Sequence, residues 1–192
     1  MHPEILERQV ARAGYVRVER LRIRLASGEE VWREVERHGD SVAVLPYDSD
    51  RGVALVARQF RAPVFDMTGG TILEEACAGM IDAGDEEATA RREALEELGV
   101  RLVTLERVAC VWPGPGVGAE RQTLFLAPYG MADRIAAGGG LAIENEGIQV
   151  VERPLEALAA DVDAGRIADG KLLTLVMALR LRHPSLFTGQ KP

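Results

Sequence analysis

The sequence predicts an α/β protein with a mixed sheet and packed helices, preceded by a β extension at the N-terminus. Residues 15–25 alternate apolar and charged side chains, which is typical of a strand with one packed face. Two apolar runs, 41–48 and 52–61, flank a polar turn and indicate a buried hairpin. Asp85 and Gly99 bracket a stretch that carries helical start and stop signals.

The composition limits the kind of protein. The chain has 192 residues, of which 47% are hydrophobic and 28% charged, and this argues against disorder. A chain of this length buries about 70% of its unfolded surface, so it forms one domain or one domain with a small appendage. The formal net charge of −7 disfavours nucleic acid as a partner. A polyanionic ligand would therefore need local arginines or a metal ion.

The cysteines and the hydropathy pattern bear on the compartment. Cys77 and Cys110 have neither the spacing of metal ligands nor the density of a secreted disulfide scaffold, so we expect two buried free thiols. No apolar run approaches the length of a membrane-spanning helix. These features predict a cytoplasmic protein with no membrane partner.

Residues 1–40 form the predicted N-terminal β extension, and residues 41–192 the main domain. We expect a short helical lead at 3–13, then the strand at 15–25, a turn, and a second strand at 31–35. A lone hairpin is marginally stable in water, so this one must pack against something.

After its first hairpin, the main domain alternates between loops, strands and helices. The stretch 62–72 has no periodicity and contains two glycines, so we expect a loop. Pro154 and Asp169 mark the starts of two helices, and the second is apolar nearly all round and should be buried. Further strands are expected at 102–112, 121–129 and 148–153.

The helix between Asp85 and Gly99 organises the rest of the chain. Asp85 is a good N-cap, acidic residues fill the first turn, and Gly99 supplies the C-terminal cap. At a helical step of about 100° per residue, two faces separate. We expect the packing face to carry Ala88, Ala94, Leu95 and Leu98, and the opposite face Glu93, Glu96 and Glu97.

The three glutamates allow two interpretations. Such a pattern is typical of a solvated helix face. Alternatively, ionised carboxylates that repel one another need a compensating cation, and hard carboxylate oxygens favour Mg²⁺ or Mn²⁺. The residues by themselves leave both interpretations open.

The surrounding residues carry a resemblance to a known family. The loop AGMIDAG, Arg92 directly before Glu93, and the residues through Val100 resemble the Nudix box of the Nudix hydrolases. The second half of that motif, Arg-Glu-apolar-any-Glu-Glu-any-Gly-apolar, is filled in register. The first half departs from it, because the loop is one residue short and Asp85 replaces the usual Glu. This shortening is similar to the branch that contains GDP-mannose and ADP-ribose pyrophosphatases.

The resemblance implies a Nudix α/β/α sandwich with Mg²⁺ or Mn²⁺ as cofactor. Arg92 is implied to orient the carboxylates. The implied metal ligands are the carbonyl of Ala78 and the carboxylates of Glu93, Glu97 and Glu146. The implied catalytic residues are Glu146, Glu96 and Glu120. Glu146 is the leading candidate for the general base, with Glu144 in reserve.

The resemblance also implies a substrate site. Arg58 and Arg61 lie near a strand end, where guanidinium groups can bind phosphates bidentately, and the resemblance singles out Arg61. Lys171 lies in a DGK sequence that is similar to one in the GDP-mannose branch. The implied substrate-binding residues are Tyr15, Arg33, Glu34, Arg61, Gly79, Glu120, Asn145 and Lys171.

The implied reaction is metal-dependent hydrolysis of a nucleoside diphosphate sugar, with GDP-mannose giving GMP and mannose 1-phosphate as first choice. The alternatives are ADP-ribose giving AMP and ribose 5-phosphate, and a Nudix-fold nucleotide-binding module that has lost turnover. The intact Glu93, Glu96 and Glu97 argue against the binding module. We also expect a homodimer, because the strands within residues 15–35 are too few to bury their own apolar face. The resemblance implies that Tyr15, Arg33 and Glu34 of this extension complete the partner's site, and the alternative is a hairpin folded back on its own domain.

Overall fold

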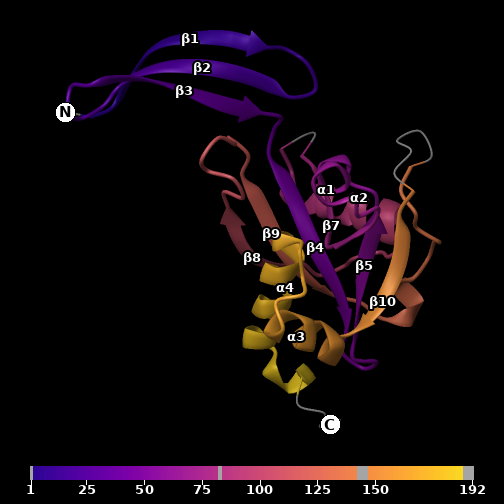
Figure 1. The fold of residues 1–192 in the computed structure, drawn as a ribbon. Coiled ribbons are helices and arrows are strands. Elements are labelled where there is room, and N and C mark those ends of the chain that lie inside the picture. Colours follow the sequence, from indigo (N-terminus) through magenta and orange to yellow (C-terminus); the bar gives the residue numbers. More distant parts are fainter. Residues whose placement is uncertain (1, 82–83, 142–146, 188–192) are drawn as a thin grey trace. The chain divides into compact units, whose positions relative to one another are not determined.

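The structure is a computed structural model that describes residues 2–81, 84–141 and 147–187 (Figure 1). The chain divides into two compact units. One unit holds the chain up to Asp40 together with Val111–Gln122, and the other holds Ser41–Cys110 and the chain from Thr123 onward.

The N-terminal unit is built on three antiparallel strands, β1 (Glu4–Arg12), β2 (Arg17–Arg24) and β3 (Glu30–Arg37). The predicted strands at 15–25 and 31–35 are confirmed, whereas the predicted helical lead at 3–13 is wrong. Residues 4–12 pair along β2 instead. An isolated helix of this length is marginal in water, while a neighbouring strand supplies partners for the backbone.

A buried carboxylate joins the three strands of this unit. Glu19 on β2 is 5% exposed, and its side chain forms ion pairs with Arg8, Arg17 and Arg37. The hydrogen bond from Arg37 holds the pKa of Glu19 below its ordinary value, although burial opposes this effect. Because Arg8 lies on β1 and Arg37 on β3, the carboxylate connects both outer strands to the central one.

The second unit contains a seven-stranded mixed sheet. Its strands are β4 (Ser41–Asp48), β5 (Val53–Gln59), β6 (Leu73–Glu75), β7 (Cys77–Met80), β8 (Glu106–Val111), β9 (Gln122–Pro128) and β10 (Gln149–Pro154). The main path runs β10-β5-β4-β9-β8, with β6 paired to β5 and β7 paired to β4. The predicted hairpin of β4 and β5 is confirmed as an antiparallel pair.

Helices cover the sheet on both faces, so the expected α/β/α sandwich is confirmed (Figure 1). The helices are α1 (Ala62–Thr68), α2 (Glu86–Leu98), α3 (Leu155–Asp163) and α4 (Gly170–Arg182), with 3₁₀ turns η1 (Met131–Asp133) and η3 (Pro184–Phe187). Strand β4 is buried along its whole length. Its Val42 and Val44 share a core cluster with Ala94 of α2, while α4 contacts the same strand. Alternate side chains of β4 point to opposite faces, which accounts for a strand buried on both sides.

The stretch 62–72 is not all loop as predicted, because α1 occupies its first part. Pro63 lies in its first turn, and Gly69 ends it in the left-handed region at φ 71°. None of its residues is buried, so the helix has no apolar periodicity for a pattern to reveal.

Several burial predictions are also corrected. Ala88 and Leu95 of α2 are exposed, and Cys110 is exposed while Cys77 is buried as predicted. Helix α4 buries one face only, with Leu181 on the opposite, exposed side. The predicted strand at 102–112 is shorter, since β8 begins at residue 106. No helix in the described ranges is long and apolar enough to span a bilayer.

Candidate functional site

Helix α2 begins and ends where the sequence predicts. The Asp85 carboxylate accepts a hydrogen bond from the Ala88 N–H at 2.9 Å, and Gly99 closes the helix at φ 68°. These two caps fix thirteen helical residues between them, and the glutamates of the Nudix-like motif fall in the last two turns.

The glutamates differ in burial, which the sequence did not predict. Glu97 is 3% exposed, and its carboxylate accepts a hydrogen bond from the Ala78 N–H at 3.3 Å. A Cβ added to Gly79 would lie 1.9 Å from Oε1 of Glu93. Both carboxylates therefore lie against the Ala78–Gly79 backbone of β7, on the packed side of α2. Glu96 keeps about a quarter of its side chain in solvent, at 27%.

Arg92 lies between two of these carboxylates. Its guanidinium contacts Oε1 of Glu93 and Oε2 of Glu96, each at 2.8 Å. A planar guanidinium with two carboxylate partners restrains the rotamers of both, here those of Glu93 and Glu96.

The donors gathered here fit a hard divalent cation. Glu97 and Glu93 bring carboxylate oxygens to the Ala78–Gly79 backbone of β7, and carboxylate and carbonyl oxygens are the ligands that Mg²⁺ and Mn²⁺ favour. Glu146, the remaining predicted ligand, lies outside the described residues, as do Glu144 and Asn145. Within the described ranges, no three acidic, histidine or cysteine side chains are gathered closely enough to hold a metal by themselves.

A second charged cluster gathers residues that are far apart in the sequence. Glu75 of β6 is 2% exposed, and it accepts hydrogen bonds from Nε of Arg61 at 2.7 Å and from Nζ of Lys171 at 3.1 Å. Asp169 accepts from the same Nζ at 2.7 Å. Burial lowers the pKa of the Lys171 ammonium, but Asp169 and then Glu75 outweigh that effect and hold the pKa above its ordinary value.

This cluster brings together the predicted substrate residues Arg61 and Lys171. Glu75 was not predicted to belong to this cluster. A signal was present, because a charged residue directly before the buried Ala76 and Cys77 must find a partner if it is buried with them.

Four predicted site residues belong to the N-terminal unit. Tyr15 and Glu34 are exposed, and Arg33 donates to the carbonyl of Trp32 at 2.9 Å. Glu120 lies 3.6 Å from Nε2 of His38 in the same unit. Their roles stay predictions.

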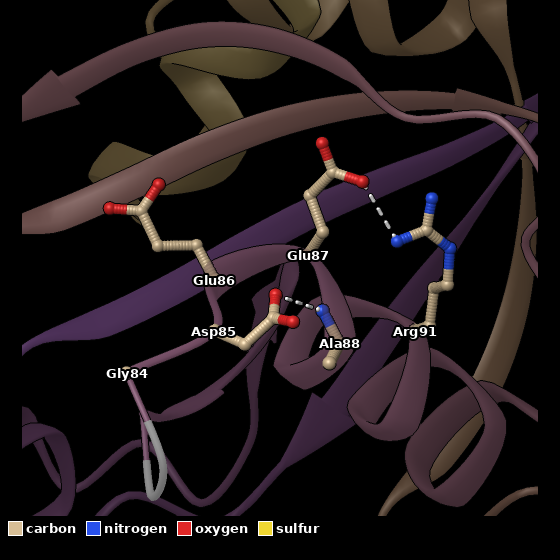
Figure 2. A pocket seen from close by; sticks show the side chains of 6 residues that line it. All are labelled: Gly84, Asp85, Glu86, Glu87, Ala88 and Arg91. Atoms are coloured by element: carbon tan, nitrogen blue, oxygen red, sulfur yellow. Dashed lines mark hydrogen bonds and ion pairs between the residues drawn. The ribbon is translucent and has the colours of Figure 1, made fainter.

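An open hollow of about 760 Å³ lies at the start of α2, and Figure 2 shows the side chains that line it. Asp85 is engaged in the helix cap, and Glu87 pairs with Arg91 at 2.9 Å. At about 1.5 Å of rise per residue, this first turn lies roughly 10 Å along the helix axis from Glu93. Neither Glu93 nor Glu97 is among the residues that line the hollow.

The sequence matches the model of the NUDIX domain over residues 37–167. The GDP-mannose pyrophosphatase of Cronobacter sakazakii is 38% identical over 152 residues, which cover 78% of this chain and 78% of that protein. The protein of the same name from Pectobacterium atrosepticum is 36% identical over 78% of this chain and 77% of its own length. That of Yersinia pestis is 34% identical over 83% of this chain and 80% of its own.

A crystal structure of an ADP compounds hydrolase is similar in fold, with a TM-score of 0.75 over 96% of both chains and 17% sequence identity. That likeness shows the fold alone. The match to the domain model spans more than half of the chain and includes the helix with Glu93 and Glu97. The chain is therefore a Nudix hydrolase, a member of the family defined by the NUDIX domain.

Proposed function

We propose that this Nudix hydrolase cleaves the diphosphate bond of a nucleoside diphosphate sugar, with GDP-mannose giving GMP and mannose 1-phosphate. The observation that carries the proposal is the identity of 34% to 38% with proteins named GDP-mannose pyrophosphatase, across 78% to 83% of the chain. The packing of Glu93 and Glu97 against Ala78–Gly79 supports a metal-assisted reaction at this place.

The metal site would use Glu93, Glu97, the carbonyl of Ala78 and Glu146. When bound, Mg²⁺ or Mn²⁺ supplies Lewis-acid stabilisation of the charge on the diphosphate. Arg92 keeps the carboxylates of Glu93 and Glu96 in a fixed orientation, so little rearrangement accompanies binding.

The diphosphate of the substrate carries two negative charges, which basic side chains can balance together with the metal. We assign Arg61 and Lys171, which meet at Glu75, to the diphosphate, and Asn145 and Glu120 to polar contacts with the rest of the substrate. In the reaction a water oxygen bonds to one phosphorus, and the bridging oxygen leaves with the other product. Glu146 is the proposed base that takes the proton from this water.

The experiment is product identification across a panel that contains GDP-mannose, ADP-ribose and other nucleoside diphosphate sugars, each with Mg²⁺, with Mn²⁺ and with chelator. GDP-mannose is expected to give GMP and mannose 1-phosphate, and chelator is expected to stop turnover. Preferred release of AMP from ADP-ribose would replace the proposed substrate. Binding of the panel without any product would favour the non-catalytic module.

The same assay tests the site with variants of one helix. Glu97→Gln is expected to lose activity by about 10³-fold or more, since a charged metal ligand is replaced by a neutral amide of equal size. Glu87→Gln is the matched control, because Glu87 lies in the first turn of α2 and pairs with Arg91. Equal activity in both variants would show that α2 does not carry the site.

The general base is tested by a second pair of variants. Glu146→Gln is expected to lose about 10²- to 10⁴-fold in turnover, and a larger loss in Glu120→Gln would reverse the assignment.

A further inference from the structure

Strand β6 carries two neighbouring glutamates whose side chains serve different clusters. Glu74 is bonded to Arg58 at 2.8 Å and to Arg153, and these three residues line an open cavity of about 570 Å³. Glu75 is bonded instead to Arg61 and Lys171. The alternation of side chains along a strand accounts for this division.

Glu75 is buried, so its charge requires the two cations that it holds. One oxygen accepts from Nε of Arg61 at 2.7 Å, and the other accepts from Nη2 of Arg61 at 3.2 Å and from Nζ of Lys171 at 3.1 Å. A bidentate guanidinium contact fixes the plane of Arg61 as well as its distance. The same carboxylate thus sets the separation between Arg61, which follows β5, and Lys171, which lies in the first turn of α4.

Asp169 holds the other side of Lys171. Its Oδ2 accepts from the N–H groups of Leu172 and Ala76, each at 3.1 Å, and its Oδ1 accepts from Nζ of Lys171 at 2.7 Å. The start of α4 is thereby attached to the backbone between β6 and β7, two residues before Ala78. Two of the three N–H groups on Lys171 are engaged by carboxylates within the described residues, which leaves the third for a ligand.

We propose that Glu75 is a positioning residue, which holds the Arg61 guanidinium and the Lys171 ammonium at a fixed spacing so that both meet the diphosphate of the substrate. This role rests on the proposed function, since it assigns a diphosphate to that pair of cations. Glu75 does not itself contact the substrate, because it is 2% exposed and like-charged with the phosphates. Its contribution is preorganisation, which lowers the cost of ordering two long side chains when the ligand binds.

The test compares Glu75→Gln with Glu74→Gln. Each variant replaces one β6 carboxylate, which is hydrogen-bonded to two basic side chains, by a neutral amide of nearly the same volume. Glu75→Gln is expected to raise KM by about 10- to 100-fold, because charge-assisted hydrogen bonds that align both cations are lost, while kcat changes by less than about threefold. Glu74→Gln is expected to keep the wild-type KM, since its partners Arg58 and Arg153 belong to the separate cluster that lines the cavity of about 570 Å³. Equal KM values in the two variants would overturn the proposal.

A second readout does not depend on activity. The chain has two lysines, Lys171 and Lys191, so isotope-labelled lysine gives one signal for each in a nuclear magnetic resonance titration. Burial lowers the pKa of the Lys171 ammonium, but Asp169 and Glu75 raise it by more. Arg61 is hydrogen-bonded to the same Glu75 carboxylate. Glu75→Gln is therefore expected to lower the pKa of Lys171. KM should rise where Lys171 loses its proton, so in this variant the rise is expected at a lower pH, whereas Glu74→Gln leaves both the pKa and the KM profile unchanged. An unchanged Lys171 titration in Glu75→Gln would contradict the geometry.

These readouts separate the two proposals. If the wild-type protein hydrolyses no nucleoside diphosphate sugar, the proposed function fails, while the titration of Lys171 still decides whether Glu75 holds it. Glu75→Asp keeps the negative charge but moves the carboxylate back by one methylene. It therefore tests the positioning role if Glu75→Gln does not fold. That variant is expected to raise KM with little change in the Lys171 titration, and a wild-type KM would show that the spacing is not set by Glu75.

Discussion

Single side chains decide how close the α2 carboxylates come to β7. Glu97 is buried and bonded to the Ala78 N–H, whereas Glu96, one residue earlier, keeps part of its side chain in solvent. Glu93 reaches the same backbone only because the next residue on β7, Gly79, has no Cβ. The absence of one methyl group therefore sets the position of a proposed metal ligand.

The first prediction follows from that contact. Gly79→Ala would place a Cβ 1.9 Å from Oε1 of Glu93, and the flexible carboxylate is what moves. We expect the affinity for Mg²⁺ or Mn²⁺ to fall by about 10- to 100-fold, as measured by metal titration of the hydrolase activity and by calorimetry. The melting temperature should change little, because no backbone strain is added.

Gly114→Ala is the control, since a Cβ there would meet no atom within 4 Å. It is expected to bind metal like the wild type. A wild-type metal affinity in Gly79→Ala would mean that Glu93 does not bind metal from this position.

At the scale of the element, α2 is held at its C-terminal end by tertiary contacts as well as by its cap. The carbonyl of Gly99 accepts hydrogen bonds from the N–H groups of Ile135 at 3.0 Å and Ala136 at 3.1 Å. The segment of residues 135–140 therefore lies directly against the end of the helix, and any side chain on Gly99 would have to share that space.

The second prediction uses two glycines with the same backbone conformation. Gly99 has φ 68°, and a Cβ added there would meet the Ala136 oxygen at 2.1 Å, whereas Gly165 has φ 66° and open space. Gly165→Ala is expected to lose about 1–2 kcal/mol from the left-handed conformation alone. Gly99→Ala adds a clash with backbone, so we expect a loss of more than about 3 kcal/mol in the free energy of unfolding, measured by urea denaturation. Equal losses would show that residues 135–140 yield without cost.

At the scale of the whole molecule, ion pairs give stability a dependence on pH. In each of six carboxylates, a hydrogen bond to the charged form is the largest effect, and it holds the pKa below its ordinary value. These residues are Glu19, Asp40, Glu106, Asp133, Glu152 and Asp161. Unfolded carboxyl groups titrate near about pH 4, so the folded state binds fewer protons in that range.

The third prediction is therefore a loss of stability on acidification. The contribution of these groups is complete above the unfolded pKa and is lost as pH falls through the lower folded pKa values. The urea midpoint should be level above about pH 5 and fall steadily below it. A midpoint that stays level or rises from about pH 5 to about pH 3 would show that these carboxylates are not stabilised by folding.

The fourth prediction concerns the assembly. Tyr15, Arg33 and Glu34 are exposed on the N-terminal unit, and we propose that they act in the partner's site of a homodimer. Co-refolding Arg33→Ala with Glu97→Gln subunits then produces heterodimers with one intact site, and roughly a quarter of wild-type activity should return. Mixtures that stay as inactive as either variant, despite heterodimers confirmed by mass, would exclude a shared site.

The sequence by itself determined the family and the helix that carries its motif. Asp85, Gly99 and the run from Arg92 to Val100 are local signals, because a cap and a helical period depend on residues within a few positions of one another. The strands of the β4–β5 hairpin followed from apolar runs for the same reason. Helix α1 did not, since it is short and buries nothing.

Only the tertiary structure decided which charges meet. Helical phase placed Glu97 beside Glu96, opposite the expected packing face, but β7 covers Glu97 because it pairs with β4 beneath the helix. The grouping of Arg61, Glu75 and Lys171 was likewise outside the reach of local patterns. It depends on β6 pairing with β5 and on the cap that fixes α4, and such long-range contacts form only when distant segments pack together.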